Sequence, residues 1–148
     1  MSNIFEKTLH IDPEYQHLEK YVHIMYRGFW TPAKYEKGIK EVDAPHFFNV
    51  LKETDQEAIK RCILAVSIVE DKIKTYWSTL ALDLPQTIIG DVGGLFGQSE
   101  ITHRRSYHAL AEALNVDTDN IQEHKALKGR IEYLAKYVET DPKIIGKK

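Results

Sequence analysis

Apolar residues recur at three- and four-residue spacing through the centre of this sequence, which is the period of a helix that buries one face. Residues 54–82 carry one such stripe, and a second runs from about 83 or 85 to 115. The stripes comprise Ile59, Ile63, Val66, Glu70, Ile73 and Trp77, then Val92, Phe96, Glu100, His103, Tyr107, Leu110 and Leu114. Strand patterns are nearly absent, so we predict an all-α fold built on two long central helices.

Shorter helices are expected on both sides of this pair. Asp12 and Pro13 mark a helix start, because aspartate caps the free N–H groups of a first turn and proline suits its first position. This helix is expected to run to about Arg27 and to end at Gly28. Residues 31–53 mix charged residues, glycine and aromatics, which predicts an irregular segment with a short helical turn.

Other signals mark the bounds of the remaining helices. Thr54 and Glu57 have the spacing of a capping box, in which each side chain accepts a hydrogen bond from the other's backbone N–H. A last helix is expected over residues 119–138, with a flexible tail from about 142 to 148. Four glycines in the second long helix predict a kink or a close approach to a neighbour. They are Gly90, Gly93, Gly94 and Gly97.

Length and composition limit the function classes. The 148 residues fit one domain, and a net charge of −2 lacks the basic excess of a general nucleic-acid binder. The single cysteine, Cys62, excludes an intramolecular disulfide and a cysteine-rich zinc site. No apolar run reaches the roughly 18 residues of a membrane span. We therefore expect a cytoplasmic protein that binds neither nucleic acids nor membranes.

Two carboxylates and a histidine interrupt the apolar stripes. Buried carboxylates are rare unless they are paired or bind a metal. Glu100 and His103 project from one side of a helical turn, and Glu70 lies on the stripe of the preceding helix. A carboxylate from one helix and a Glu-x-x-His motif from the next form half of a carboxylate-bridged di-metal site. Tyr107 lies one further turn along the same stripe.

Each of these residues also has an ordinary structural interpretation. Glu-x-x-His occurs by chance in many helices, and Glu70 can reach solvent from a frayed helix end. His103 can be a hydrogen-bonded core histidine, and Tyr107 can serve packing alone. The combination of all four residues on facing stripes is what favours metal binding.

Three segments resemble the small (β) subunits of class I ribonucleotide reductases. Residues 99–108, Ser-Glu-Ile-Thr-His-Arg-Arg-Ser-Tyr-His, resemble the family's Glu-x-x-His-x-Arg-Ser-Tyr segment, which carries metal ligands and the radical. Residues 67–70, Ser-Ile-Val-Glu, resemble the first-ligand helix that precedes that segment. Residues 29–32, Phe-Trp-Thr-Pro, resemble the family's Phe-Trp-x-Pro. The motifs follow the family's order, and the resemblance covers nearly the whole chain.

This resemblance implies a role for each matching residue. Glu70, Glu100 and His103 would be metal ligands in a ferritin-like di-metal helical bundle, of which this chain supplies the N-terminal half. Tyr107 would be oxidised to a stable radical, and Trp30 would transfer an electron during cofactor assembly. The activity served is the reduction of ribonucleotides to deoxyribonucleotides on the large (α) subunit.

The sequence departs from the family's pattern in two ways. The resemblance implies a di-iron centre first. Glu70 stands where the family usually has aspartate, which keeps manganese–manganese and manganese–iron pairs as alternatives. No second Glu-x-x-His follows His108, which leaves three of the family's six protein ligands. This fits one half of a split small subunit or a truncated one, and Met1 and a stop after a helix favour the split product.

The resemblance also implies partners. A complementary C-terminal half chain would supply a second Glu and a second Glu-x-x-His. The assembled small subunit would form a dimer and dock on the large subunit.

Two other functions remain open from the residues. A ferritin-like iron oxidase would complete its di-iron site by two-fold symmetry, each copy giving one Glu and one Glu-x-x-His. It needs no complementary chain, but it assigns no role to Trp30 or Tyr107. The other alternative is a metal-free helical interaction module. A chain that binds no metal even in the presence of its partner would indicate this function.

Overall fold

The computed structural model describes residues 4–5, 7–118 and 125–138, and the regular elements within them are all helical. A 3-10 turn at Gln16–Leu18 precedes the first α-helix, and a π-helical turn at Ile39–Asp43 joins the second to the third. The α-helices are α1 (Glu19–Gly28), α2 (Ala33–Gly38), α3 (Ala44–Val50), α4 (Glu53–Asp83), α5 (Thr87–Ala113) and α6 (Lys125–Val138). The all-α prediction is confirmed for these residues, and the ferritin-like half-bundle stays a prediction.

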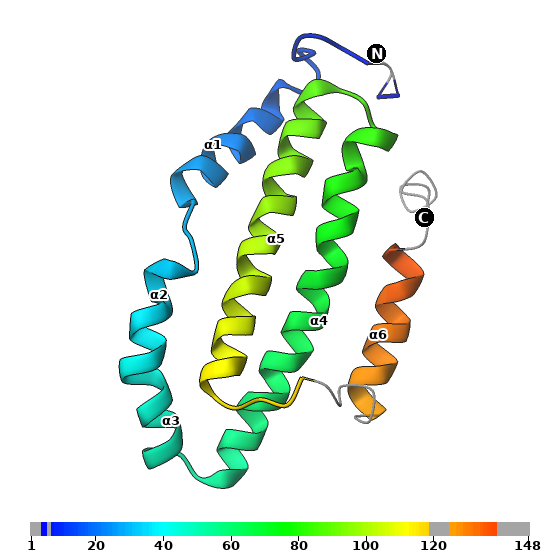
Figure 1. Cartoon of the computed structure of the whole chain (residues 1–148). Helices are drawn as coiled ribbons and strands as arrows, with labels where there is room; N and C mark the ends of the chain where they lie inside the picture. Colours follow the sequence, from blue (N-terminus) through cyan, green and yellow to red (C-terminus); the bar gives the residue numbers. More distant parts are fainter. Residues whose placement is uncertain (1–3, 6, 119–124, 139–148) are drawn as a thin grey trace.

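α4 and α5 form the centre of the molecule. They run antiparallel, side by side, and a short connection at residues 84–86 joins them (Figure 1). α1, α2 and α3 lie along the α5 side of the pair, and α6 packs against α4 on the other side. The bounds of both long helices agree with the predicted ones to within one turn. α5 ends where Asn115 adopts a left-handed φ of 52°, which asparagine tolerates better than most residues.

Three groups of buried side chains hold the helices together. Phe47 of α3, only 3% exposed, packs with residues of α4 and α5 at one end of the pair. Burial of a phenylalanine of this kind contributes about 1.5–3 kcal/mol. The second group joins α4 to α6, and the third lies where α4 meets the start of α5. The groups comprise Ala44, Phe47, Ile63, Ala111 and Leu114, then Leu64, Ile68 and Leu127, and finally Leu80, Ile88 and Ile89.

α4 buries two faces, whereas its predicted stripe accounts for one. Ile63 is buried as the stripe predicts. Leu64 and Ile68, which the stripe does not include, are buried against α6. Ile59 belongs to the predicted stripe but is 36% exposed, since it lies near the free start of the helix.

Gly93 and Gly97 allow α5 to approach α4 closely. A Cβ added at Gly93 would lie 2.8 Å from the backbone oxygen of Trp77. A Cβ added at Gly97 would lie 2.7 Å from Ser78 Oγ. Both distances are shorter than side-chain carbons normally adopt, so the predicted close approach is confirmed at these two positions.

The segment before α1 differs from the prediction. Asp12 Oδ1 accepts a hydrogen bond from the backbone N–H of Glu14, and the Asp12 carbonyl accepts one from Tyr15. The aspartate therefore closes a turn instead of capping an α-helix, and α1 begins only at Glu19. The predicted end of this helix at Gly28 is confirmed.

The prediction of an irregular segment over residues 31–53 is wrong. Helical structure continues from Ala33 through the π-helical turn to Val50. Lys40 and Glu36 form an ion pair of 2.7 Å one turn apart, and Phe47 anchors the segment in the core. Tertiary packing thus stabilises a helical conformation in a segment whose sequence has only a weak intrinsic preference for it.

The predicted capping box is also wrong. α4 begins at Glu53 after an extended Lys52, and no side chain caps it. Thr54 therefore lies inside the first turn instead of preceding it. Gln56 Nε2 instead donates a hydrogen bond to the Leu51 carbonyl at 3.0 Å, which ties the first turn to the preceding segment.

The predicted last helix is present as α6. Its predicted start, residues 119–124, and the predicted tail at 142–148 lie outside the described residues. None of the described helices combines the length and the apolar character that a membrane crossing requires.

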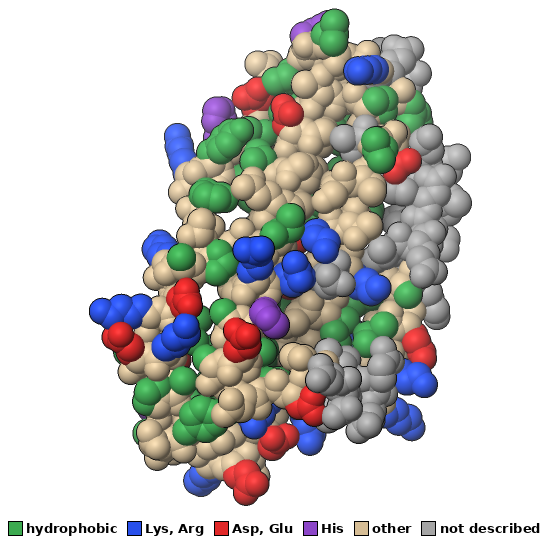
Figure 2. Space-filling model, viewed as in Figure 1, with side chains coloured by type: hydrophobic (Ala, Val, Ile, Leu, Met, Phe, Trp, Pro, Cys, Tyr) green, Lys and Arg blue, Asp and Glu red, His purple; other side chains and the backbone are tan. Residues whose placement is uncertain are grey.

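Several large hydrophobic side chains remain at the surface. Tyr26 and Ile24 of α1 are 68% and 60% exposed, and Phe29, directly after α1, is 58% exposed. On the face viewed in Figure 2, hydrophobic side chains reach the surface over α1 and around α3, with charges of both signs between them. Large apolar side chains are therefore exposed to solvent on the α1 side of the molecule.

Candidate metal centre

α4 and α5 bring three potential metal ligands together. Glu70 lies within α4, and Glu100 and His103 lie one turn apart in α5. One ligand atom from each of the three residues lies within 4.8 Å of the others. Within the described residues this is the one group of three or more histidine, cysteine and carboxylate side chains that can hold a metal. The three ligands predicted from the sequence therefore converge at one point.

One nitrogen of the His103 imidazole, Nδ1, contacts two carboxylates. His103 Nδ1 is 3.2 Å from Glu100 Oε2 and 3.4 Å from Glu70 Oε2. The Glu70 and Glu100 side chains are only 14% and 13% exposed, whereas that of His103 is 35% exposed. The carboxylates are thus largely withdrawn from water, while the imidazole keeps an open side.

The pKa of Glu70 lies well above that of an ordinary glutamate. Burial, and after it the neighbouring Glu100 carboxylate, together raise the pKa of Glu70 from 4.5 to about 7. His103 acts in the opposite direction and lowers the pKa of Glu70, but by less. Two carboxylates held this close in a partly dry site favour a shared proton or a bound cation.

Trp30, which follows α1, contacts the predicted histidine ligand. The ring centroids of Trp30 and His103 are 5.9 Å apart, with an angle of 33° between the rings. Tyr35 of α2 packs edge-on against the Trp30 ring, with a centroid distance of 5.2 Å. Trp30 was predicted as a functional residue only because it matches the family's Phe-Trp-x-Pro motif. The structure places it in contact with His103, a member of the metal-ligand group, by which we mean Glu70, Glu100 and His103.

Two neighbours of the group were not identified from the sequence. Ser99 Oγ lies 3.4 Å from His103 Nε2, so the serine can fix the orientation of the ring. Its position four residues before His103, on the same helix face, is a signal that could have identified it. Tyr35 had no such signal, because its contact with Trp30 depends on the helical path of residues that were expected to be irregular.

Tyr107 lies on α5 one turn beyond His103, as predicted, and its side chain is half-buried. Its radical role stays a prediction.

The donor set fits a first-row transition metal. Carboxylate oxygens and an imidazole nitrogen suit iron, manganese and zinc, and the absence of thiolate ligands in the group disfavours softer metals. The raised pKa of Glu70 fits the same assignment, because a cation would remove the mutual repulsion of the two carboxylates. Three ligands leave coordination positions that other donors would fill.

Comparison with known proteins does not identify a family. No protein-family model matches the chain, and no curated protein matches it. The resemblance to ribonucleotide reductase small subunits therefore stays a sequence-based prediction, and the function has to be argued from the site.

Proposed function

We propose that this chain is the metal-binding and radical-generating half of a class I ribonucleotide reductase small subunit. The observation that carries the proposal is the convergence of Glu70, Glu100 and His103 between α4 and α5. These residues were chosen from sequence motifs alone, and their ligand atoms lie within 4.8 Å of one another. The ring contact between Trp30 and His103 supports the same function, because an electron relay has to reach a ligand of the metal.

The residues have separate tasks in this proposal. Glu70 and Glu100 would hold the metal pair through carboxylate oxygens, and His103 through a ring nitrogen. When bound, the metal pair supplies the oxidising power for radical formation at Tyr107. Trp30 passes an electron towards His103 through the contact between their rings. Ser99 holds the imidazole in position through its hydroxyl.

The proposal requires a complementary chain. Three ligands are half of what the family's metal pair uses, so a second Glu and a second Glu-x-x-His would come from a C-terminal half chain. The assembled small subunit would form a dimer and dock on the large (α) subunit, where ribonucleotides are reduced. Iron is the metal that we expect first, and Glu70 in place of aspartate keeps manganese–manganese and manganese–iron pairs as alternatives.

Metal titration of the chain with and without the complementary half tests the proposal. We expect two metal ions per assembled unit, measured by elemental analysis and by paramagnetic resonance of Mn(II). His103→Ala should lower the affinity for metal at least tenfold, because loss of a mere hydrogen-bond partner of a ligand already costs roughly 10–100-fold. His108→Ala is the matched control, because this side chain is 68% exposed on the same helix. Equal affinities of the two variants would contradict the proposal.

A ferritin-like iron oxidase is a second candidate, and one observation favours it. Two helices of a single chain already supply one Glu and one Glu-x-x-His, so a second copy would supply the rest. A homodimer that forms on iron addition and holds two iron ions at its interface would indicate this function. A chain that binds no metal even with its partner would be a helical interaction module.

A further inference from the structure

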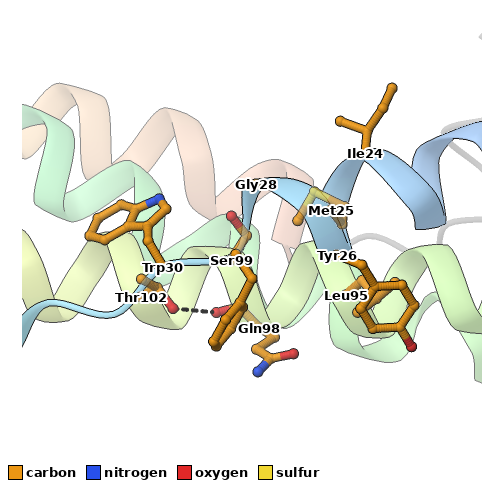
Figure 3. Close-up of a pocket in the computed structure, with 10 residues that line it drawn as sticks. Ile24, Met25, Tyr26, Gly28, Trp30, Leu95, Gln98, Ser99 and Thr102 are labelled. Atoms are coloured by element: carbon orange, nitrogen blue, oxygen red, sulfur yellow. Dashed lines mark hydrogen bonds between the residues drawn. The ribbon is translucent and has the colours of Figure 1, made fainter. Parts of the chain in front are cut away.

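A cavity lies between α1, the segment that follows it, and α5. Its volume is about 420 Å³, within the range of small-molecule binding sites. Figure 3 shows Trp30 and Tyr26 towards opposite ends of the lining, with Ser99 and Thr102 between them. The cavity is lined by Ile24, Met25, Tyr26, Gly28, Phe29, Trp30, Leu95, Gln98, Ser99 and Thr102.

The chemistry of the lining defines the class of molecule that fits. None of the lining side chains carries a charge, so the cavity does not compensate a charged ligand. Three of them are aromatic, and aromatic faces favour a flat ring as partner. The α5 wall is polar at Gln98, Ser99 and Thr102, and the Thr102 hydroxyl already donates to the Gln98 carbonyl at 3.2 Å. The side chains of the opposite wall are polar only at the Tyr26 hydroxyl and the Trp30 indole N–H.

We propose that this cavity binds a small, uncharged aromatic molecule. Its ring would pack among Trp30, Met25 and Leu95, and one polar substituent would face Gln98 on the α5 wall. The volume of about 420 Å³ admits a molecule of up to three aromatic rings. The exposed side chains of Ile24 and Tyr26 form the rim, which leaves an entrance from solvent.

The cavity adjoins the metal-ligand group without sharing its ligands. Trp30 lines the cavity and also contacts the His103 ring, and Ser99 lines it and lies 3.4 Å from His103 Nε2. A bound ring would therefore lie against two residues that contact His103. The proposal does not depend on the proposed function, because the cavity exists in the metal-free chain.

Binding of N-phenyl-1-naphthylamine, an uncharged aromatic fluorophore, tests the proposal on the metal-free full chain. We expect a saturable rise of its emission with one molecule bound per chain. The chain has two tryptophans, so Trp77→Phe leaves Trp30 as the sole tryptophan donor. Energy transfer from Trp30 to the bound probe should persist in this variant, because the probe lies beside Trp30.

A charge placed in the cavity provides the specificity test. Leu95→Lys should weaken binding by roughly tenfold or more, because the ammonium group would lie among apolar walls. Ile101→Lys is the matched control on the same helix, since Ile101 is 40% exposed and does not line the cavity. Thr102→Phe, which fills the cavity without a charge, should weaken binding by a similar factor. Circular dichroism verifies that each variant is folded.

Three results would overturn the proposal. The first is emission that rises without saturation, which indicates adherence to the exposed apolar surface of α1. The second is equal affinity of Leu95→Lys and Ile101→Lys for the probe. The third is loss of binding when the complementary half chain is added, which would show that polypeptide fills the cavity. Failure of metal binding alone would contradict the proposed function and leave this binding unchanged.

Discussion

Replacement of Glu70 by glutamine should stabilise the metal-free protein at pH 8. Burial, reinforced by Glu100, raises the pKa of the Glu70 carboxyl from 4.5 to about 7. A carboxyl with a raised pKa in the folded state is held in its neutral form, so its ionisation opposes folding. Glutamine has nearly the same shape, keeps one acceptor oxygen, carries an NH₂ donor in place of the other, and cannot ionise.

The direction of the pKa shift fixes the pH dependence. Below pH 4.5 the Glu70 carboxyl is neutral in the folded and unfolded chains, so it does not disfavour folding. Between pH 4.5 and about 7 it ionises first in the unfolded chain, and stability falls as the pH rises. Above about pH 7 the destabilisation is constant.

The magnitude follows from the same pKa. At about 1.4 kcal/mol per pKa unit, the full difference between 4.5 and about 7 is worth about 3.5 kcal/mol. Solvent screens part of it, because the Glu70 side chain is 14% exposed and His103 beside it is 35% exposed. We therefore expect the glutamine variant to gain about 1–2 kcal/mol at pH 8 and to lose metal affinity.

Urea unfolding in the presence of a chelator, followed by circular dichroism at pH 4.5, 6 and 8, measures this gain. The stability difference between Glu70→Gln and the original chain should be near zero at pH 4.5 and largest at pH 8. Glu132→Gln is the control, because Glu132 is exposed on α6. A Glu70→Gln variant with no gain at pH 8, or with a gain that shrinks as the pH rises, would refute the electrostatic argument.

Three further predictions concern the helix contact, the radical and the isolated chain. Gly93→Ala should destabilise the protein by about 1–3 kcal/mol through overpacking against Trp77. Gly94→Ala, where a Cβ meets nothing within 4 Å, should stabilise it by about 0.5–1 kcal/mol in the same urea assay. Tyr107→Phe should keep helicity and metal loading but abolish any organic radical signal and ribonucleotide reduction in the complete assembly; unchanged turnover would exclude its radical role. The isolated chain should bind metal weakly, and nanomolar binding of two ions per monomer in calorimetry would contradict the split-subunit proposal.

The central helices and the metal-ligand group were predictable because periodicity specifies both. A helical period fixes which side chains share a face, so Glu70 on one stripe and Glu100 with His103 on the other had to meet once the helices paired. The antiparallel pairing itself follows from the short connection between α4 and α5. Glycines at Gly93 and Gly97 marked the close contact in advance.

The remaining differences arise where packing overrides local preference. The helical path of residues 33–50 depends on the burial of Phe47 against α4 and α5, and no local pattern specifies that contact. Asp12 and Thr54 carry capping chemistry, but Asp12 bonds to Glu14 in a turn, and Gln56 makes the side-chain bond at the start of α4. A sequence does not rank such alternatives. The contact of Trp30 with His103 and the cavity beside it depend on how α1 lies on α5, which periodicity does not determine.

The close contacts of Gly93 and Gly97 with α4 restrict how α5 can move along α4, and this restriction affects the metal-ligand group. Gly97 lies one turn before Glu100 and touches Ser78, so α5 cannot slide along α4 without driving bulkier neighbours into the contact. Close packing at Gly97 therefore opposes the sliding that would separate Glu70 from Glu100 along the helix axes. The two carboxylates stay close in the folded chain, where a bound cation would relieve their repulsion.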